Sequence, residues 1–339
     1  MRKKRCKFIR GLGWIFLSII CVIGVFFAIS EITPDPVAYI TRSLFSGFGK
    51  GTHYPQVSDF SEYESRVIET SDTAYPSSVG NNTLDFIMPA NPSGSRLPVL
   101  FWVHGGAFVG GDKADARDYM VMLANEGLVV VNVNYGLTPE VKYPNQILQL
   151  KEAYDYISAN AEQYDVDISK VVLGGDSAGA SIVGQFVNAQ VNDAYAKDSG
   201  ISQVIATPTD IKGVVFLSGL LNTKEIDETG NAVIDYMFNK SAWAYYGDKN
   251  WKDSVQADFG DLAGHVGGSF PPTFITDGKN GSFESQAKTL EAELRSLNVS
   301  VTSKYYDSSL GHEYQFIMDY PESLETYDAL KAFLSEVLR

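Results

Sequence analysis

The chain contains very little cysteine. The only two cysteines, Cys6 and Cys21, lie within the first 30 of its 339 residues. The rest of the chain therefore has no disulfide framework, and a cysteine nucleophile is excluded there. Histidines are also few and scattered, and none of them joins a cluster of cysteines and carboxylates with the spacing of metal ligands: His53, His104, His265 and His312. We therefore expect neither a metal nor a disulfide-stabilised fold.

Basic residues are scarce after the N-terminal segment. Six of the 27 lysines and arginines lie in residues 1–30, which leaves 21 basic residues against 41 acidic ones in the rest. A surface of this charge repels nucleic acid, so no nucleic-acid partner is expected. No internal repeat or low-complexity tract is present, and 45% hydrophobic against 20% charged residues indicates a globular protein.

The N-terminal segment has the pattern of a membrane signal. A basic flank is followed by residues 11–29, nineteen residues without a charge. This length can cross a bilayer, and the flanking charges favour a cytoplasmic N-terminus with the rest of the chain outside. We predict that residues 1–30 form a basic flank and an uncleaved transmembrane signal anchor in the cell membrane. The alternative is secretion after cleavage near Ala28-Ile29-Ser30, where small residues occur.

The remainder of the chain alternates between apolar strands and amphipathic helices. We expect residues 31–65 to be a linker and cap segment, and residues 66–339 to be one domain that includes an irregular, pocket-shaping insertion at 222–268. Strands that alternate with helices predict an α/β fold with a mostly parallel sheet covered on both faces. The predicted strands are 66–70, 83–88, 98–103, 128–133, the run before Ser177, 214–218, 271–276 and 299–305.

One stretch, residues 170–181, predicts a strand, a sharp turn and a helix with Ser177 at the apex. Gly175 and Gly179 lie two residues to either side of this serine. Only small neighbours fit such a turn, and its strained backbone raises the serine hydroxyl above the sheet. Ser177 is therefore the candidate nucleophile.

A serine nucleophile needs a base, and His312 is the best candidate. It follows the predicted last strand, so a loop can carry it back over the serine. His265, which precedes the strand at 271–276, is the second choice. Because the carboxyl ends of parallel strands meet at one edge of a sheet, His312 and Ser177 are expected to lie together there.

An acyl-transfer transition state also needs N–H donors for its oxyanion. The pair Gly105 and Gly106 follows His104 at the end of the predicted strand 98–103, and glycine backbone can approach a ligand closely. The amide of Ala178, directly after the nucleophile, is a further candidate donor.

These motifs carry a resemblance. Residues 104–107 (HGGA) and 175–179 (GDSAG) resemble the oxyanion motif and nucleophile elbow of the hormone-sensitive-lipase-like esterases, which have the α/β-hydrolase fold. The resemblance extends over roughly residues 60–339 and implies hydrolysis of carboxylic esters through an acyl-enzyme without a cofactor. It also implies that Gly105 and Gly106 donate to the oxyanion and that His104 is structural.

The chain departs from this family at the residue that orients the histidine. The family has an Asp-Pro-Leu-type turn after the penultimate strand, where this chain has residues 276–284 (TDGKNGSFE), with Asn280 or Gly281 in the place of the aspartate. Glu284, in the first turn of the next helix, is the favoured acid, although a carboxylate there also suits a helix N-terminus in its own right. The alternatives are Asp277 at the strand end, or a Ser–His dyad without an acid.

The sequence therefore predicts a serine carboxylesterase that acts on short- to medium-chain acyl or acetyl esters, on a small molecule or a polymer. Two other functions stay open. A peptidase on the same fold is one, and a non-catalytic binding or scaffold relative is the other. The missing aspartate favours the scaffold, whereas a strained serine, a histidine and an oxyanion glycine pair favour the enzyme.

Overall fold

The computed structural model describes residues 2–49, 57–92 and 96–339, so residues 50–56 of the predicted cap segment lie outside the described residues. Its centre is an eight-stranded sheet with the order β1-β2-β4-β3-β5-β6-β7-β8. β1 and β2 pair antiparallel with each other, β2 pairs antiparallel with β4, and the other pairs are parallel. The strands are β1 (Val67–Ala74), β2 (Thr83–Pro89), β3 (Leu97–Val103), β4 (Val129–Val133), β5 (Val166–Asp176), β6 (Ile211–Leu217), β7 (Thr273–Thr276) and β8 (Val301–Lys304). The prediction of a mostly parallel sheet is confirmed.

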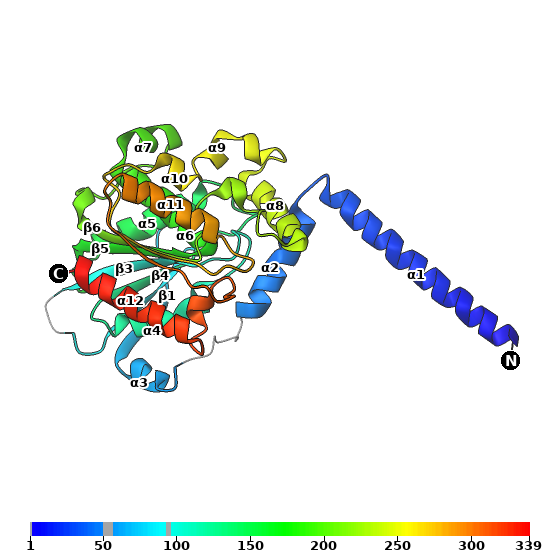
Figure 1. The fold of residues 1–339 in the computed structure, drawn as a ribbon, viewed down its shortest axis with the longest axis horizontal. Coiled ribbons are helices and arrows are strands. Elements are labelled where there is room, and N and C mark those ends of the chain that lie inside the picture. The colour runs from blue at the N-terminus through cyan, green and yellow to red at the C-terminus, as the bar shows by residue number, and fades with distance from the viewer. Residues whose placement is uncertain (1, 50–56, 93–95) are drawn as a thin grey trace.

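Helices cover both faces of this sheet (Figure 1). The helices of the described residues are α1 (Arg2–Ser30), α2 (Asp35–Gly49), α3 (Phe60–Ser65), α4 (Arg117–Ala124), α5 (Asn145–Ala159), α6 (Ser177–Val191), α7 (Asp193–Ser199), α8 (Ala232–Tyr246), α9 (Val255–Asp258), α10 (Leu262–His265), α11 (Glu284–Ser296) and α12 (Pro321–Val337), of which α1 projects away from the sheet. Short 3₁₀ turns occur at Lys113–Ala116, Pro208–Asp210, Thr223–Glu225, Trp251–Asp253 and Tyr314–Phe316.

The core lies in two apolar layers because side chains alternate along each strand. Val99, Phe101 and Val103 of β3 point into one layer, with α5, α6 and α11, whereas Leu100 and Trp102 point into the other, with α4 and α12. All five are at most 1% exposed. A strand buried on both faces explains the continuous apolar run in its sequence.

The segment 222–268 differs from its predicted irregular structure, because it contains the fifteen-residue helix α8. The side chain of Asn231 accepts hydrogen bonds from the N–H groups of Val233 and Ile234 and begins the helix. Gly247 ends it in the left-handed conformation, with φ of 76°. Residues 243–246 (WAYY) contain no charged or strongly polar residue, so the sequence there lacks the alternation of apolar and polar positions that predicts an amphipathic helix.

The predicted transmembrane helix is not supported. Among the residues from Trp14 onward whose side chains are described, no single helix combines the length and hydropathy of a membrane span. The helical segments Trp14–Ser30 and Asp35–Phe45 meet these requirements only together, and they are bent by 105° at the break between them.

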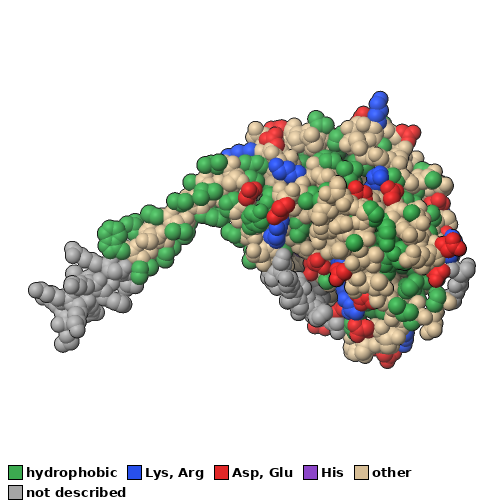
Figure 2. Space-filling view, turned by 180° about the vertical axis from the view of Figure 1, so that it is seen from behind, with side chains coloured by type: hydrophobic (Ala, Val, Ile, Leu, Met, Phe, Trp, Pro, Cys, Tyr) green, Lys and Arg blue, Asp and Glu red, His purple; other side chains and the backbone are tan. Residues whose placement is uncertain are grey.

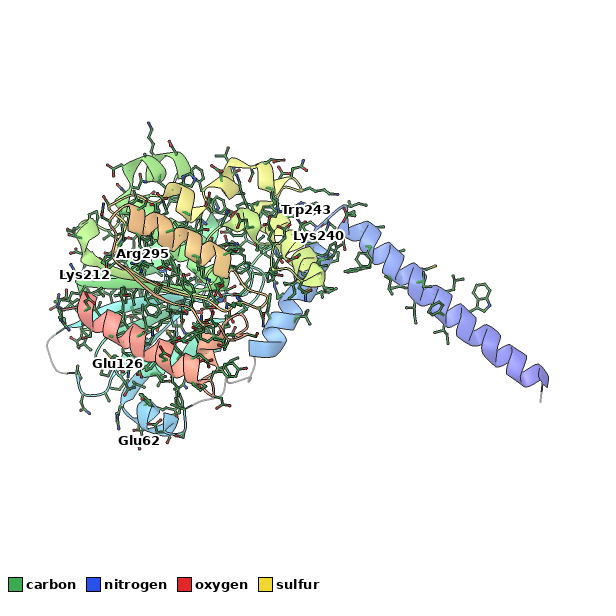
Figure 3. The ribbon with its side chains drawn as sticks, in the orientation of Figure 1. Glu62, Glu126, Lys212, Lys240, Trp243 and Arg295 are labelled. Carbon is green, nitrogen blue, oxygen red and sulfur yellow. The ribbon has the colours of Figure 1, made fainter. Side chains whose placement is uncertain are left out.

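This bend is fixed to the domain by ion pairs. Glu31, at the end of α1, accepts hydrogen bonds from Lys240 of α8 at 2.7 Å and from Lys249 at 3.1 Å. Both ammonium groups also lie over the ring of Trp243, at 5.0 and 5.3 Å from its centroid. Lys240 and Trp243 lie side by side on α8 next to the bend (Figure 3). The direction in which α1 leaves the domain is therefore held by charge pairing and cation–π contacts.

A second anchor connects α2 to the loop that follows β3. Arg42 donates from Nε to the carbonyl oxygen of Val109 at 2.6 Å and from Nη2 to that of Thr138 at 2.5 Å. Its guanidinium also pairs with Glu140 at 2.5 Å. The N-terminal helix α2 is thus held against the loop that carries the predicted oxyanion glycines.

Further along the same loop, a buried lysine connects three segments. Lys113 is 6% exposed at its side chain, and its ammonium lies 2.7 Å from Asp72 and 3.0 Å from the equally buried Asp85. Its backbone N–H donates to Asn134. The loop after β3 is thereby fixed to β1 and β2.

We expect Lys113→Met to lower the free energy of unfolding by about 3–5 kcal/mol, because it leaves the buried carboxylate of Asp85 without a counter-charge. Urea denaturation at pH 7 measures the loss. The control is Lys224→Met, whose partner Asp258 is 55% exposed, so that about 0–1 kcal/mol is expected. Equal losses of unfolding free energy in the two variants would contradict the conclusion that Lys113 neutralises a buried carboxylate.

Candidate active site

Ser177 lies at the turn between β5 and α6, where its φ of +48° is in the left-handed region. A side chain at Gly179 would place Cβ 2.0 Å from the carbonyl oxygen of Val103 in β3, and one at Gly175 would place Cβ 2.7 Å from the backbone of Gly179. The two glycines are therefore required by close backbone packing, and the strained serine at the apex matches the prediction.

His312 follows β8 and reaches back over this turn. Its Nε2 lies 3.0 Å from Oγ of Ser177. The ring of Phe283 meets the imidazole edge to face, at 5.5 Å between centroids. The structure thus brings together the serine and the histidine that the sequence selected.

Asp277 is the carboxylate on the other side of the imidazole. It lies at the end of β7, is 1% exposed, and accepts hydrogen bonds from the N–H groups of Gly278 at 2.7 Å and Phe283 at 3.0 Å. The hydroxyl of Ser282 lies between Asp277 and His312, with Oγ 2.6 Å from Nδ1 of the imidazole and hydrogen-bonded to Oδ1 of the carboxylate. Burial raises the pKa of Asp277 to about 6, against the lowering effect of His312 and Ser282.

The expectation that Glu284 orients the histidine is wrong. Its carboxylate pairs with Lys288 one turn along α11 at 2.9 Å. Glu284 is the first residue of that helix and directly follows Phe283, whose backbone N–H donates to Asp277. His265 is also elsewhere, because its Nε2 lies 3.0 Å from the carbonyl oxygen of Asp258. Of the two carboxylates that the sequence left open, the structure brings Asp277 to the histidine.

The assignment of Gly105 as an oxyanion donor also needs correction. Its N–H already donates to Oδ2 of Asp176 at 2.7 Å. Within the described residues, the N–H groups of Gly106 and Ala107 have no acceptor, and both residues have positive φ, of 107° and 50°. Ala178, the second residue of α6, has an N–H without an intrahelical acceptor. The available donors are therefore Gly106, Ala107 and Ala178, of which Ala107 was missed because the sequence pattern showed only its glycine neighbours.

Buried polar groups hold this loop in place. Asp176 accepts from Nε1 of Trp102 at 2.9 Å as well as from Gly105. Burial and the nearby carboxylate of Glu313 raise the pKa of Asp176 well above its usual range. The His104 ring stacks on Tyr135 at 4.4 Å, and burial lowers the pKa of His104 to about 4, so this imidazole is neutral at pH 7. His104 is thus a structural residue of the loop.

The sheet order, the strained serine turn and the histidine loop define the class of this protein: an α/β-hydrolase fold of the kind found in hormone-sensitive-lipase-like esterases. The chain matches the BD-FAE family over residues 84–294, more than half of its length, and it belongs to this family.

Several curated relatives are esterases. The chain is 28% identical over 231 residues to the versiconal hemiacetal acetate esterase of Dothistroma septosporum, covering 67% of this chain and 69% of that protein. It is 31% identical over 114 residues to the acetyl esterase of Salmonella schwarzengrund, covering 33% and 34%. For most of the first relatives, the match spans only about a third of their length.

Solved structures resemble the chain over more of its length. Esterase B from Lactobacillus rhamnosis aligns with a TM-score of 0.69 and 24% identity over 82% of this chain and 93% of that one. A bacterial heroin esterase aligns with a TM-score of 0.64 and 21% identity, over 86% and 96%. At these identities the likeness establishes the fold.

The burial of Asp277 predicts a pH-dependent effect on stability. Because its pKa is raised from 3.8 to about 6, the folded chain binds this proton more tightly than the unfolded chain does, and its contribution to stability declines as pH rises from about 4 to 6. Asparagine resembles the protonated carboxyl and removes this decline. We expect the melting temperature of Asp277→Asn, relative to wild type, to be higher at pH 7.5 than at pH 4.5. A difference that is the same at both pH values would contradict the raised pKa.

Proposed function

We propose that this protein is a serine carboxylesterase that hydrolyses acetyl or other short- to medium-chain acyl esters through an acyl-enzyme. The observation that carries the proposal is the contact of 3.0 Å between Nε2 of His312 and Oγ of Ser177, at a serine whose backbone is strained. Strain of this kind persists where a hydroxyl has to be presented to a reactant.

The chemistry proceeds in two steps. Oγ of Ser177 attacks the ester carbonyl carbon while its proton passes to Nε2 of His312, and the imidazolium then protonates the departing alkoxide. In the second step, water loses a proton to the same imidazole as it attacks the acyl carbon. The bond from that carbon to Oγ of Ser177 then breaks, the imidazolium returns its proton to Oγ, and the acid leaves. The N–H groups of Gly106, Ala107 and Ala178 are the donors for the oxyanion of both tetrahedral intermediates. No cofactor takes part in these steps.

Aromatic rings around His312 support an apolar acyl group. Phe283 contacts the imidazole, Phe238 of α8 lies 6.3 Å from Phe283, and Phe45 of α2 lies 6.4 Å from Phe238, between ring centroids. This row leads from the histidine to the N-terminal helix α2. An apolar row of this kind beside the histidine suits a short or medium acyl chain, and the relatives named as acetyl and acetate esterases agree with a small acyl group.

The test is hydrolysis of p-nitrophenyl esters with acyl chains of increasing length. We expect wild type to be active and Ser177→Ala to lose at least about 10⁴-fold in kcat, because no other group replaces the nucleophile. Glu284→Gln is the control, and we expect it to keep kcat within about twofold because its carboxylate pairs with Lys288.

Three outcomes distinguish this function from its alternatives. A folded wild-type protein without turnover, and without labelling of Ser177 by a serine-directed phosphonate, would indicate a binding or scaffold protein. Faster turnover of peptides than of esters would indicate a peptidase. An active Ser177→Ala variant would show that the chemistry occurs elsewhere.

We also propose that residues 11–29 attach the protein to a membrane, with the domain outside the cell. Support comes from the apolar side chains that α1 exposes as it leaves the domain (Figure 2). Trp14 is 70% exposed, Phe16 66% and Val22 67%. In water, such a surface is costly, whereas lipid would cover it.

Vesicle flotation measures this attachment. We expect the full chain to float with phosphatidylcholine vesicles. Replacing Ile20 and Ile23 together by glutamate should abolish flotation, because charge in an apolar segment opposes burial in lipid, while ester turnover stays at the wild-type level. Flotation of this variant would contradict the proposed attachment.

A further inference from the structure

We propose that Ser282 is a positioning residue of the active site, whose hydroxyl connects the buried carboxylate of Asp277 to the imidazole of His312. The proposal rests on the function proposed above. The functional unit then has four side chains in a row: Ser177, His312, Ser282 and Asp277.

The contacts form an unbroken line. Oγ of Ser177 lies 3.0 Å from Nε2 of His312, and Nδ1 of the same ring lies 2.6 Å from Oγ of Ser282. The Ser282 hydroxyl bonds in turn to Oδ1 of Asp277. Across the described residues, no carboxylate oxygen bonds to Nδ1 directly. The hydrogen-bonded route from Asp277 to that nitrogen therefore passes through the Ser282 hydroxyl. The carboxylate of Glu313 lies on the other side of the ring, 3.6 Å from Nε2.

The direction of each hydrogen bond follows from the chemistry of the groups. An ionised carboxylate can only accept, so Ser282 has to donate its single proton to Asp277. The Ser282 oxygen is then an acceptor for His312, which has to carry its proton on Nδ1. This tautomer leaves Nε2 unprotonated and able to take the proton of Ser177. Asp277 thus selects the reactive tautomer without touching the ring.

The backbone holds Ser282 in this place. Asn280, two residues earlier, donates from its backbone N–H to the carbonyl oxygen of Leu310 at 3.0 Å and from its side chain to that of Ser309 at 3.1 Å. The loop that carries Ser282 is therefore fixed to the loop that carries His312. Gly281, with φ of +60°, provides the turn between Asn280 and Ser282.

The connection also matters for the transition state. When His312 takes the proton of Ser177, the ring becomes an imidazolium, and the Nδ1–H to Ser282 hydrogen bond becomes charge-assisted. Because Ser282 donates to Asp277, its oxygen is more negative and stabilises this charge better. The proton of Ser177 stays on Nε2 until the leaving group takes it, and no proton moves to Asp277.

The decisive test compares Ser282→Thr with Ser282→Val in the full chain. The two side chains have the same shape, and only threonine keeps the hydroxyl. We expect Ser282→Thr to retain kcat within about threefold of wild type. Ser282→Val should lose roughly 10- to 100-fold in kcat, the loss expected for a hydrogen bond to a charged group, with KM changed by less than about twofold. Thermal melting checks that both variants fold.

Two further measurements separate positioning from a structural role. Ser282→Val removes the acceptor at Nδ1 of the imidazolium and leaves Glu313, 3.6 Å from Nε2, and the charge of Asp277 in place. The acid limb of the kcat/KM profile should therefore move to lower pH in Ser282→Val, and Ser282→Thr should keep the wild-type profile. In combination with Asp277→Asn, Ser282→Ala should cost little more than either change alone, since both break the same connection. The matched control is Ser285→Ala. Ser285 is an exposed serine in the first turn of α11, three residues after Ser282, and its substitution should leave the kinetics at the wild-type level.

The outcomes are distinct. Equal kcat values for the threonine and valine variants, or additive losses for Ser282→Ala and Asp277→Asn, in an enzyme that depends on Ser177, would overturn the role of Ser282 and leave the esterase function intact. Absence of both ester turnover and phosphonate labelling in wild type would overturn the function and this role together.

Discussion

The structure depends on one close backbone contact, the approach of the turn after β5 to the end of β3. Gly179 lies so near the carbonyl oxygen of Val103 that no side chain fits between them. This contact permits α6 to begin directly above the sheet with Ser177 in a left-handed conformation. Since β3 and β5 are neighbouring parallel strands, the same contact brings the loop after β3 beside the serine.

Around this contact, buried polar groups fix the loops that the sheet leaves irregular. Asp176 connects the turn to Trp102 and to the N–H of Gly105, and so it occupies the first amide of the loop and leaves the next two amides available. Buried charges and dipoles of this kind are costly unless their partners are complete. The loop geometry is therefore specified by hydrogen bonds, in a region where apolar packing alone would permit several conformations.

The far side of His312 shows how a chain can lack the expected aspartate and keep a carboxylate connected to the imidazole. Asp277 lies deeper, at the strand end, where the N–H groups of Gly278 and Phe283 and the Ser282 hydroxyl bind it. The hydroxyl spans the remaining distance. A deeper acid is better shielded from water but costs more to ionise, as the raised pKa of Asp277 indicates.

The sequence by itself determined the parallel sheet, the serine turn and the histidine, because period, glycine spacing and strand ends are local signals. It did not determine which carboxylate serves His312. Glu284 and Asp277 are both close to that position in the sequence, and only the tertiary structure brings the loop with His312 against Ser282 and Asp277. Nor did it show that the N–H of Gly105 donates to the carboxylate of Asp176 and is therefore not available to an oxyanion. Such choices depend on which side chains meet across loops from different strands, and no local pattern encodes a meeting of that kind.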